Sequence, residues 1–341
     1  MSTPPDHNVQ KESYDKKNYF ISLKNYRVAT ISLVVGLVAL YFGAVQTGFL
    51  PGPTSPGPSP TPPVSSASPV GSPSPTPETP GTTDIERRPD GSLREIRTGK
   101  THSYYDLSAK EHAEKAEALK SAGYRPLSIS ITKGGYTALW RRSPGPPFVV
   151  SKEMSGSEYQ RFWEIWKDKG YVEVISAAYG SGGDAVFSSV MEQRNVLHMA
   201  YFGLTAAELA EQNDRAKAQN LIPAYVAAYG GAGDIRYTAA WVENVDSVEW
   251  DYTVNQTLDE LSSERKRRDD AEPGIVTISS DERYTAIWMD TPERYIYWGY
   301  SIDYHSDHLQ EALAKGYEPI WITASQVGSG SLHTLIAGRE S

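Results

Sequence analysis

The chain repeats one pattern five times, and this repetition constrains its fold more than any other feature. In the clearest copy, residues 197–242, an apolar segment is followed by a capped helix, a segment led in by Pro223, a glycine turn and a segment that ends at Trp241. Similar patterns occur at 103–142, 148–194, 247–290 and 295–337. One unit of this size cannot bury both of its faces alone, so we expect the copies to pack together.

Four copies begin their predicted helix with a hydroxyl residue that is followed three positions later by glutamate. In such a capping box the hydroxyl accepts a hydrogen bond from the glutamate N–H, and the carboxylate accepts one from the N–H of the cap. The pairs are Ser108 with Glu111, Ser155 with Glu158, Thr205 with Glu208, and Thr257 with Glu260. In the fifth copy His305 and His308 occupy the aligned positions, which predicts a weaker cap.

Each predicted helix is followed by two short strands, and the first four are followed by a third. A Gly or Asn residue ends the helix, two strands form a hairpin around a turn that is usually rich in glycine, and an aromatic strand leads into the next helix. The order predicts an α+β repeat protein of five strand–helix–strand–strand units over residues 103–341. We expect a closed ring that resembles an α/β propeller, with sheets inward and helices outside. An open, curved solenoid is the alternative.

The residues of several copies resemble a known family. The segments GYRPLSIS…YTALW, FGLTAAELAEQ and YVAAYGGAGDIRYTAAW are similar to the bacterial tandem repeat in the N-terminal half of polyglycine hydrolases. That repeat also occurs in other exported proteins, often beside serine β-lactamase-like domains. The resemblance covers roughly 103–341 and implies a repeat domain that accompanies catalysis elsewhere without containing it. It brings no catalytic residue to this chain, where the hydrolase half is absent.

The N-terminal third predicts membrane anchoring. Residues 1–27 form a polar tail that is followed by an uncharged apolar segment, 28–50, long enough for a transmembrane helix. Because Lys24 and Arg27 precede this segment, we expect the N-terminus in the cytoplasm and the repeats outside the cell membrane. Residues 51–83 are a Pro-rich disordered linker, and 84–102 are a lead-in to the repeats. A cleaved signal peptide is the rival interpretation.

Composition and motifs give little support to catalysis. The formal net charge of −9 argues against a nucleic-acid partner, and the chain has no cysteine for disulfides or thiolate metal sites. Ser-x-x-Lys patterns begin at Ser13, Ser130 and Ser263, but none is placed at a predicted helix start as that chemistry requires. We therefore predict no catalytic residue and no cofactor.

His305, Asp307 and His308 form the one tight cluster with metal-ligating side chains. Two histidines three positions apart on a helix can share a divalent ion. Their alignment with the capping positions of the other copies favours a structural role, so no metal site is predicted.

The best candidate binding surface is aromatic and belongs to the strands that precede the helices. Such rings can stack on a glycan or hold an extended peptide, although alternate positions of a strand face opposite sides. The candidates are Tyr201, Phe202, Trp250, Tyr252, Tyr295, Tyr297, Trp298 and Tyr300. The predicted function is a membrane-anchored, extracytoplasmic domain for binding or scaffolding in the cell envelope, with a glycan or peptide partner. A cell-wall hydrolase and a passive spacer or sensor arm are the alternatives.

Overall fold

The computed structural model describes residues 83–268, 272–289 and 294–339. The predicted tail (1–27), transmembrane helix (28–50) and nearly all of the linker (51–83) lie outside these ranges. Within them, no helix is both long enough and apolar enough to cross a bilayer. The prediction of a single-pass protein of the cell membrane therefore finds no support in the described ranges.

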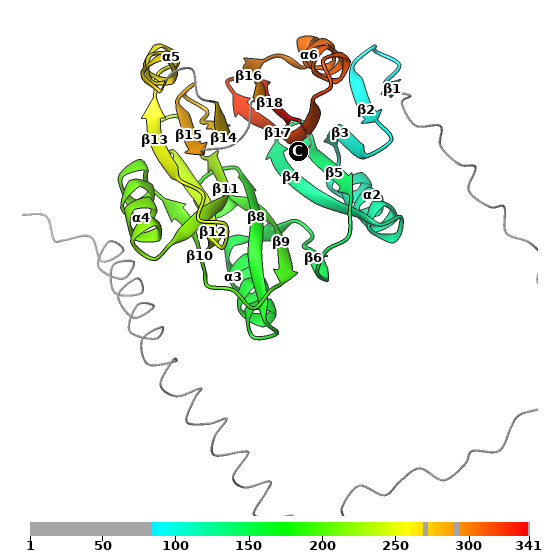
Figure 1. Cartoon of the computed structure of the whole chain (residues 1–341). Helices are drawn as coiled ribbons and strands as arrows, with labels where there is room; N and C mark the ends of the chain where they lie inside the picture. Colours follow the sequence, from blue (N-terminus) through cyan, green and yellow to red (C-terminus); the bar gives the residue numbers. More distant parts are fainter. Residues whose placement is uncertain (1–82, 269–271, 290–293, 340–341) are drawn as a thin grey trace, which may run out of the picture. The chain divides into compact units, whose positions relative to one another are not determined.

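The described elements follow the five copies along the chain (Figure 1). The first copy holds β3 (Thr101–Leu107), α2 (Ala109–Ser121), β4 (Tyr124–Thr132) and β5 (Gly135–Arg142), and two strands of the lead-in, β1 (Asp84–Arg87) and β2 (Leu93–Arg97), come before it. The second holds β6 (Phe148–Val150), β7 (Met154–Ser155), α3 (Gly156–Lys167), β8 (Tyr171–Tyr179), the short 3-10 helix η1 (Gly182–Asp184) and β9 (Val186–Gln193).

The remaining three copies are more alike. The third holds β10 (His198–Leu204), α4 (Ala206–Ala218), β11 (Leu221–Tyr229) and β12 (Arg236–Glu243). The fourth holds β13 (Trp250–Gln256), α5 (Leu258–Arg267), β14 (Pro273–Ile278) and β15 (Tyr284–Met289). The fifth holds β16 (Arg294–Tyr300), α6 (Ile302–Ala314), β17 (Glu318–Val327) and β18 (Gly330–Gly338).

Capping chemistry sets the helix starts, as the sequence predicts. Thr205 Oγ1 accepts from the Glu208 N–H at 3.2 Å, and the Thr205 N–H donates to Glu208 Oε2 at 2.9 Å. The other three predicted boxes are also present, at α2, α3 and α5. At the helix ends, Gly123 and Asn220 have φ of 83° and 53°, the left-handed conformation expected of a residue that stops a helix.

The predicted start of the fifth helix is wrong. The helix α6 begins at Ile302 with Ser301 as its N-cap, so His305 lies inside it. In the structure, a residue with positive φ lies two positions before the N-cap and marks the helix start. This residue is Gly299 before α6 (φ 76°) and Gly203 before α4 (φ 75°). At this residue the outer strand shifts register and releases the chain into the helix. Because Tyr304 replaces glutamate three residues after Ser301, the sequence shows no capping box.

The predicted fold class is also wrong. Half of the described structure is strand and a quarter is helix, and the strands form five separate antiparallel sheets. In the described ranges no strand ladder joins one repeat to the next, so the sheets do not close into a ring. In each repeat we call the strand before the helix the outer strand and the two strands after the helix the second and third strands. The physical reason lies in the strand order, which is β10-β12-β11 in the third copy. The outer strand pairs with the third strand of its own repeat, and the sheet ends at the second strand. The first sheet also gains β1 and β2, and β6 and β7 split the outer strand of the second copy.

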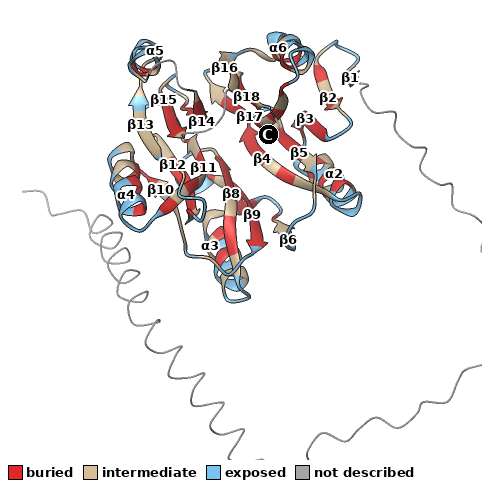
Figure 2. Cartoon of the chain, viewed as in Figure 1, coloured by how far each residue is buried: buried red, intermediate tan, exposed pale blue. Residues whose placement is uncertain are grey.

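The core lies between the sheets and the helices that surround them (Figure 2). Third strands supply its centre: Ala138, Trp140, Ala239 and Trp241 are fully buried. One apolar cluster runs through all five repeats. A second joins Leu93 and Ile96 of the lead-in to α6 and β17 of the last repeat. The second strands β4 and β17 also contact each other, so the first and last repeats lie side by side.

Candidate functional site

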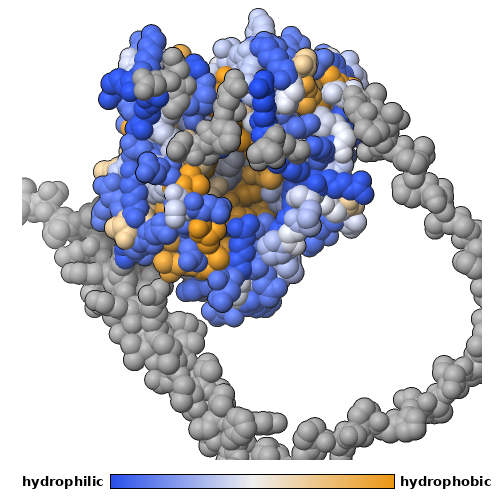
Figure 3. Space-filling view, viewed as in Figure 1, coloured by the Kyte–Doolittle hydropathy of each residue, from blue (hydrophilic) through white to orange (hydrophobic). Residues whose placement is uncertain are grey.

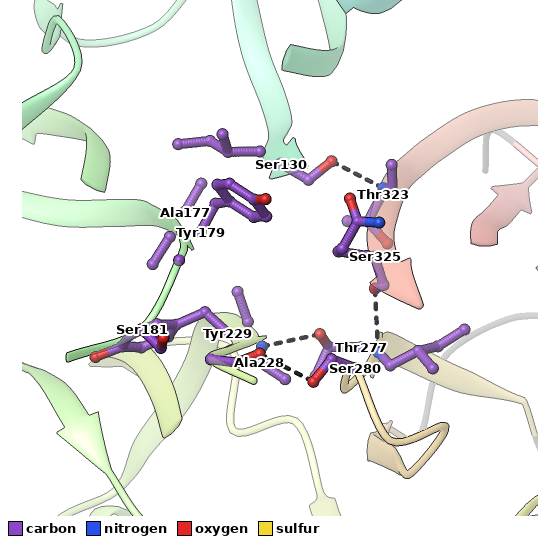
Figure 4. Close-up of a pocket in the computed structure, with 18 of the residues that line it drawn as sticks. Ser130, Ala177, Tyr179, Ser181, Ala228, Tyr229, Thr277, Ser280, Thr323 and Ser325 are labelled. Carbon is purple, nitrogen blue, oxygen red and sulfur yellow. Dashed lines mark hydrogen bonds between the residues drawn. The ribbon is translucent and has the colours of Figure 1, made fainter. Parts of the chain in front are cut away.

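A pocket lies where the second strands of all five repeats end. It has a volume of about 340 Å³ and is lined by residues of β4, β8, β11, β14 and β17 and of the turns that follow them. Figure 3 shows a hollow near the middle of the viewed face with hydrophobic surface around it, and Figure 4 shows the lining residues converging from the separate strands. We call this site the central pocket.

Small residues at equivalent positions leave room for the pocket. Ala177, Ala227, Thr277 and Thr323 occupy the same place in their repeats, each opposite a Ser or Thr of the neighbouring third strand. Turns that contain glycine follow β8, β11 and β17, so little side-chain volume enters the space from above. The pocket therefore results from the packing of the five copies, because each copy contributes the end of its second strand to the lining.

Hydroxyl groups connect the second strands, whose edges that face the centre carry no strand ladder in the described part of the chain. Ser130 Oγ accepts from the Ala324 N–H at 2.8 Å and so joins β4 to β17. Thr277 Oγ1 accepts from the Ala228 N–H at 3.0 Å, and Ser280 Oγ donates to the Gly230 oxygen at 2.9 Å (Figure 4). These bonds satisfy backbone groups that strand pairing leaves open.

The pocket is uncharged but polar. No Asp, Glu, His, Lys or Arg is among the described residues that line it. The Thr323 side chain is only 6% exposed, and its Oγ1 has no hydrogen-bond partner within the described structure. Ser181 adds an exposed hydroxyl at the rim. Because a cation is missing from this wall, the pocket suits neutral groups that hydrogen-bond rather than phosphates or carboxylates.

The predicted aromatic residues of repeats 3 and 4 lie on the outer strands, not in the pocket lining. Phe202 is 37% exposed and meets the Tyr159 ring edge-on at 5.0 Å. Trp250 Nε1 donates to the Leu221 oxygen at 2.9 Å, and the Tyr252 hydroxyl donates to Asp214 Oδ1 at 2.6 Å. Tyr201 is half-buried against Trp241. These side chains pack an outer strand against a neighbouring helix or strand.

The predicted aromatic residues of repeat 5 form a surface group on β16. Tyr295 and Tyr297 share a hydrogen bond of 2.8 Å between their hydroxyls. Tyr297 stacks on His308 at 3.6 Å between ring centroids, and Tyr300 meets the same ring edge-on. Trp298 packs on the apolar core, with the Arg265 guanidinium over its ring. A binding role for the eight aromatic residues stays a prediction.

The histidines of the predicted cluster make contacts with different partners. His305 is buried, and its Nε2 lies 3.0 Å from the Tyr105 hydroxyl. Burial lowers the pKa of His305 well below its usual value, so the ring is neutral. His308 stacks on Tyr297, and Asp307 is exposed. In the described ranges, no three His, Asp or Glu residues are grouped as a metal would require.

Sequence reasoning missed the pocket because its residues carry no chemical signature. Alanine, serine and threonine at strand ends are ordinary core residues, and the glycines after Tyr179 and Tyr229 indicate hairpin turns. Only the alignment of the five copies with one another points to the pocket. In all five copies the second strand ends with small or hydroxyl residues before its turn, as at Ala177, Thr277 and Thr323.

Four segments match the family model described as the polyglycine hydrolase-like structural repeat: residues 98–143, 145–194, 198–244 and 291–334. Together they cover more than half of the chain. The chain belongs to the polyglycine hydrolase-like structural repeat family. The predicted resemblance is thus confirmed.

The family repeat accounts for the described structure beyond the matched segments. Between the third and fourth matches, β13, α5, β14 and β15 repeat the order and strand pairing of β10, α4, β11 and β12. The family is one of structural repeats.

Proposed function

We propose that the repeat domain is a binding module that takes a short, uncharged ligand in the central pocket, without catalysis of its own. The observation that carries this proposal is the convergence of five strand ends on one neutral, polar pocket. Its volume of about 340 Å³ is at the lower end of ordinary ligand pockets. A tripeptide, a tetrapeptide of small residues or a disaccharide has a suitable size.

A peptide with small side chains fits the lining best. The walls combine alanines and backbone edges with Tyr179, Tyr225 and Tyr229, and the space between them suits a peptide backbone better than bulky substituents. Polyglycine, which appears in the name of the family, is a peptide of this kind. Peptides and glycans of a cell envelope supply both classes of neutral ligand. The glycan is therefore the alternative within the same test.

Calorimetric titration of the full chain tests the proposal. The probes are acetyl-tetraglycine-amide, which has no terminal charges, and the disaccharide of N-acetylglucosamine. We expect the blocked peptide to bind with a Kd on the order of 0.1–1 mM, since a small neutral ligand gains only modest free energy. The disaccharide should bind more weakly.

Two variants locate the binding. Ala228→Leu places a larger side chain in the pocket lining and should weaken peptide binding at least about tenfold, because the added volume occupies ligand space. Ala218→Leu is the matched control, since Ala218 is exposed near the end of α4. Equal binding by both variants, or no binding of either probe to the unmodified chain, would refute the proposal and favour a passive spacer.

A further inference from the structure

The second repeat differs from the other four at one buried position. At the residue that precedes the register shift of each second strand, the others carry proline, for example Pro126 and Pro223, and the second carries Glu173. The Glu173 side chain is fully buried. A buried carboxyl in place of an apolar ring carries a large desolvation cost, so its surroundings indicate what it does.

Hydroxyl groups alone hold this carboxyl. The Tyr159 hydroxyl lies 2.9 Å from Glu173 Oε1 and 2.8 Å from Oε2, and Ser189 Oγ lies 2.5 Å from Oε1. Within the described ranges no Lys, Arg or His contacts it. Burial raises the pKa of Glu173 to about 7, while hydrogen bonds from Ser189 and Tyr159 oppose that shift. The carboxyl therefore titrates near neutral pH.

The hydroxyls continue as a chain into the third repeat. The Tyr159 hydroxyl is 3.0 Å from Ser176 Oγ, and Ser176 Oγ is 2.5 Å from Thr238 Oγ1. Thr238 Oγ1 in turn lies 3.3 Å from the main-chain carbonyl oxygen of Tyr201, at the point where β10 shifts register. Ser176 directly precedes the pocket residue Ala177. The chain thus connects Glu173 with the junction of repeats 2 and 3 beside the pocket.

The proton on Glu173 determines the direction of this chain. When Glu173 is neutral, its O–H can donate to Tyr159, which leaves Tyr159 able to donate to Ser176, Ser176 to Thr238, and Thr238 to the main-chain carbonyl oxygen of Tyr201. When Glu173 is ionised, it only accepts. Tyr159 then donates to Glu173, and keeping the next two links bonded requires Ser176 to donate to Tyr159 and Thr238 to donate to Ser176. The bond to the Tyr201 oxygen is lost, and a charge is left buried.

Other charged groups of the surrounding elements are engaged elsewhere. On β9, Glu192 pairs with Arg125 of β4 and with Arg194. At the two ends of β12, Arg236 pairs with Asp234, and Glu243 accepts from the Leu197 N–H. On β10, burial lowers the pKa of His198 below its usual value of 6.5, so its ring is neutral at neutral pH. The second strand β11 has no charged residue. On α3, Tyr159 touches Glu173, but burial raises its own pKa well above 10.

We propose that protonation of Glu173 tightens the junction between repeats 2 and 3 through this hydroxyl chain, so that the central pocket binds its ligand more strongly when the carboxyl is neutral. The coupling to binding rests on the proposed function. The change at the junction does not, and it is measured separately.

Hydrogen–deuterium exchange of the full chain tests the junction. Amides of β8 and β10 should lose about tenfold in protection between pH 6 and pH 8, relative to Glu173→Gln at the same pH. Glutamine accepts from Ser189 and donates to Tyr159, as the neutral carboxyl does, so this variant should stay protected at both values. Glu173→Pro, which restores the residue of the other copies, should also show no pH effect. Equal pH dependence in all three chains overturns the proposal.

Ligand titration separates the two claims. With acetyl-tetraglycine-amide as the probe, the unmodified chain should bind about tenfold more weakly at pH 8 than at pH 6, and Glu173→Gln should bind equally at both. If the unmodified chain binds the peptide equally at both pH values, the coupling between Glu173 protonation and ligand binding is contradicted. If no binding occurs at either pH, the proposed function fails, and the exchange measurement still decides whether the junction responds to Glu173.

Discussion

Glu173 shows how one residue gives a repeat protein a property that its other copies lack. Its folded pKa of about 7 lies above the ordinary value of 4.5, so the folded chain keeps a proton that the unfolded chain releases. Stability from this group is therefore fully present below pH 4.5 and is lost as the pH rises to about 7. Buried histidines with lowered pKa values, such as His112, shift stability the opposite way over part of this range.

A comparison of variants isolates the carboxyl, because the histidines are common to both chains. Relative to Glu173→Gln, the unmodified chain should lose about 3 kcal/mol of unfolding free energy between pH 4.5 and pH 7.5. Urea denaturation at several pH values measures both curves. A difference that stays constant with pH would show that Glu173 does not titrate in this window.

Two pocket hydroxyls should differ sharply in what they contribute to stability. Ser130 Oγ accepts from the buried Ala324 N–H, so Ser130→Ala strands that donor and should cost about 1–3 kcal/mol. Thr323 Oγ1 has no partner in the described structure, so Thr323→Val should be neutral or slightly stabilising. Chemical denaturation of both variants checks this, and similar stability losses would contradict it.

At the scale of elements, local chemistry predicted most of the fold. Neighbours in sequence determine the hydroxyl–glutamate pairs, the hairpins and the left-handed residues that follow the helices. The structure confirms the pair at Thr205 and the left-handed residues Gly123 and Asn220. The start of α6 escaped prediction because Ser301 lacks the glutamate partner that makes a cap recognisable. Its position after Gly299 depends on a register shift between strands, which the sequence does not display.

Helix caps provide a test at this scale. Thr205→Ala removes the acceptor of the Glu208 N–H and should cost about 1 kcal/mol of stability. Ser301→Ala should cost clearly less, because the Ser301 side chain makes no cap hydrogen bond. Thermal denaturation of the two variants gives the comparison. A larger loss for Ser301→Ala would mean that the hydroxyl caps α6 after all.

For the whole molecule, the sequence predicted that the repeats pack but not how they join. The sequence predicts a closed, propeller-like ring because five copies suit that arrangement, whereas the observed sheets stay separate and meet through hydroxyls such as Ser130 and Thr277. These contacts join residues far apart in the chain, and single serines or threonines give no sign of their partners. The pocket was missed for the same reason, since it exists only where all five strands end.

The lead-in contributes to this assembly. Ile96 of β2 is 2% exposed and belongs to the apolar cluster that contains Leu309 and Ala312 of α6. Ile96→Ala should therefore cost about 2–4 kcal/mol and should lower the exchange protection of α6, although the two segments are far apart in sequence. Val245→Ala, at a position 71% exposed, is the control. Unchanged protection of α6 would show that the lead-in does not hold the last repeat.

Methyl NMR of the full chain, labelled at alanine, tests the central claim most directly. Addition of acetyl-tetraglycine-amide should shift the methyl signals of Ala177, Ala228 and Ala324 together, because these residues line the pocket from three different repeats. The signal of Ala218 should stay in place, since this residue is exposed near the end of α4. Shifts confined to one repeat, or shifts on the outer strands alone, would contradict a single site built by the convergence of all five copies.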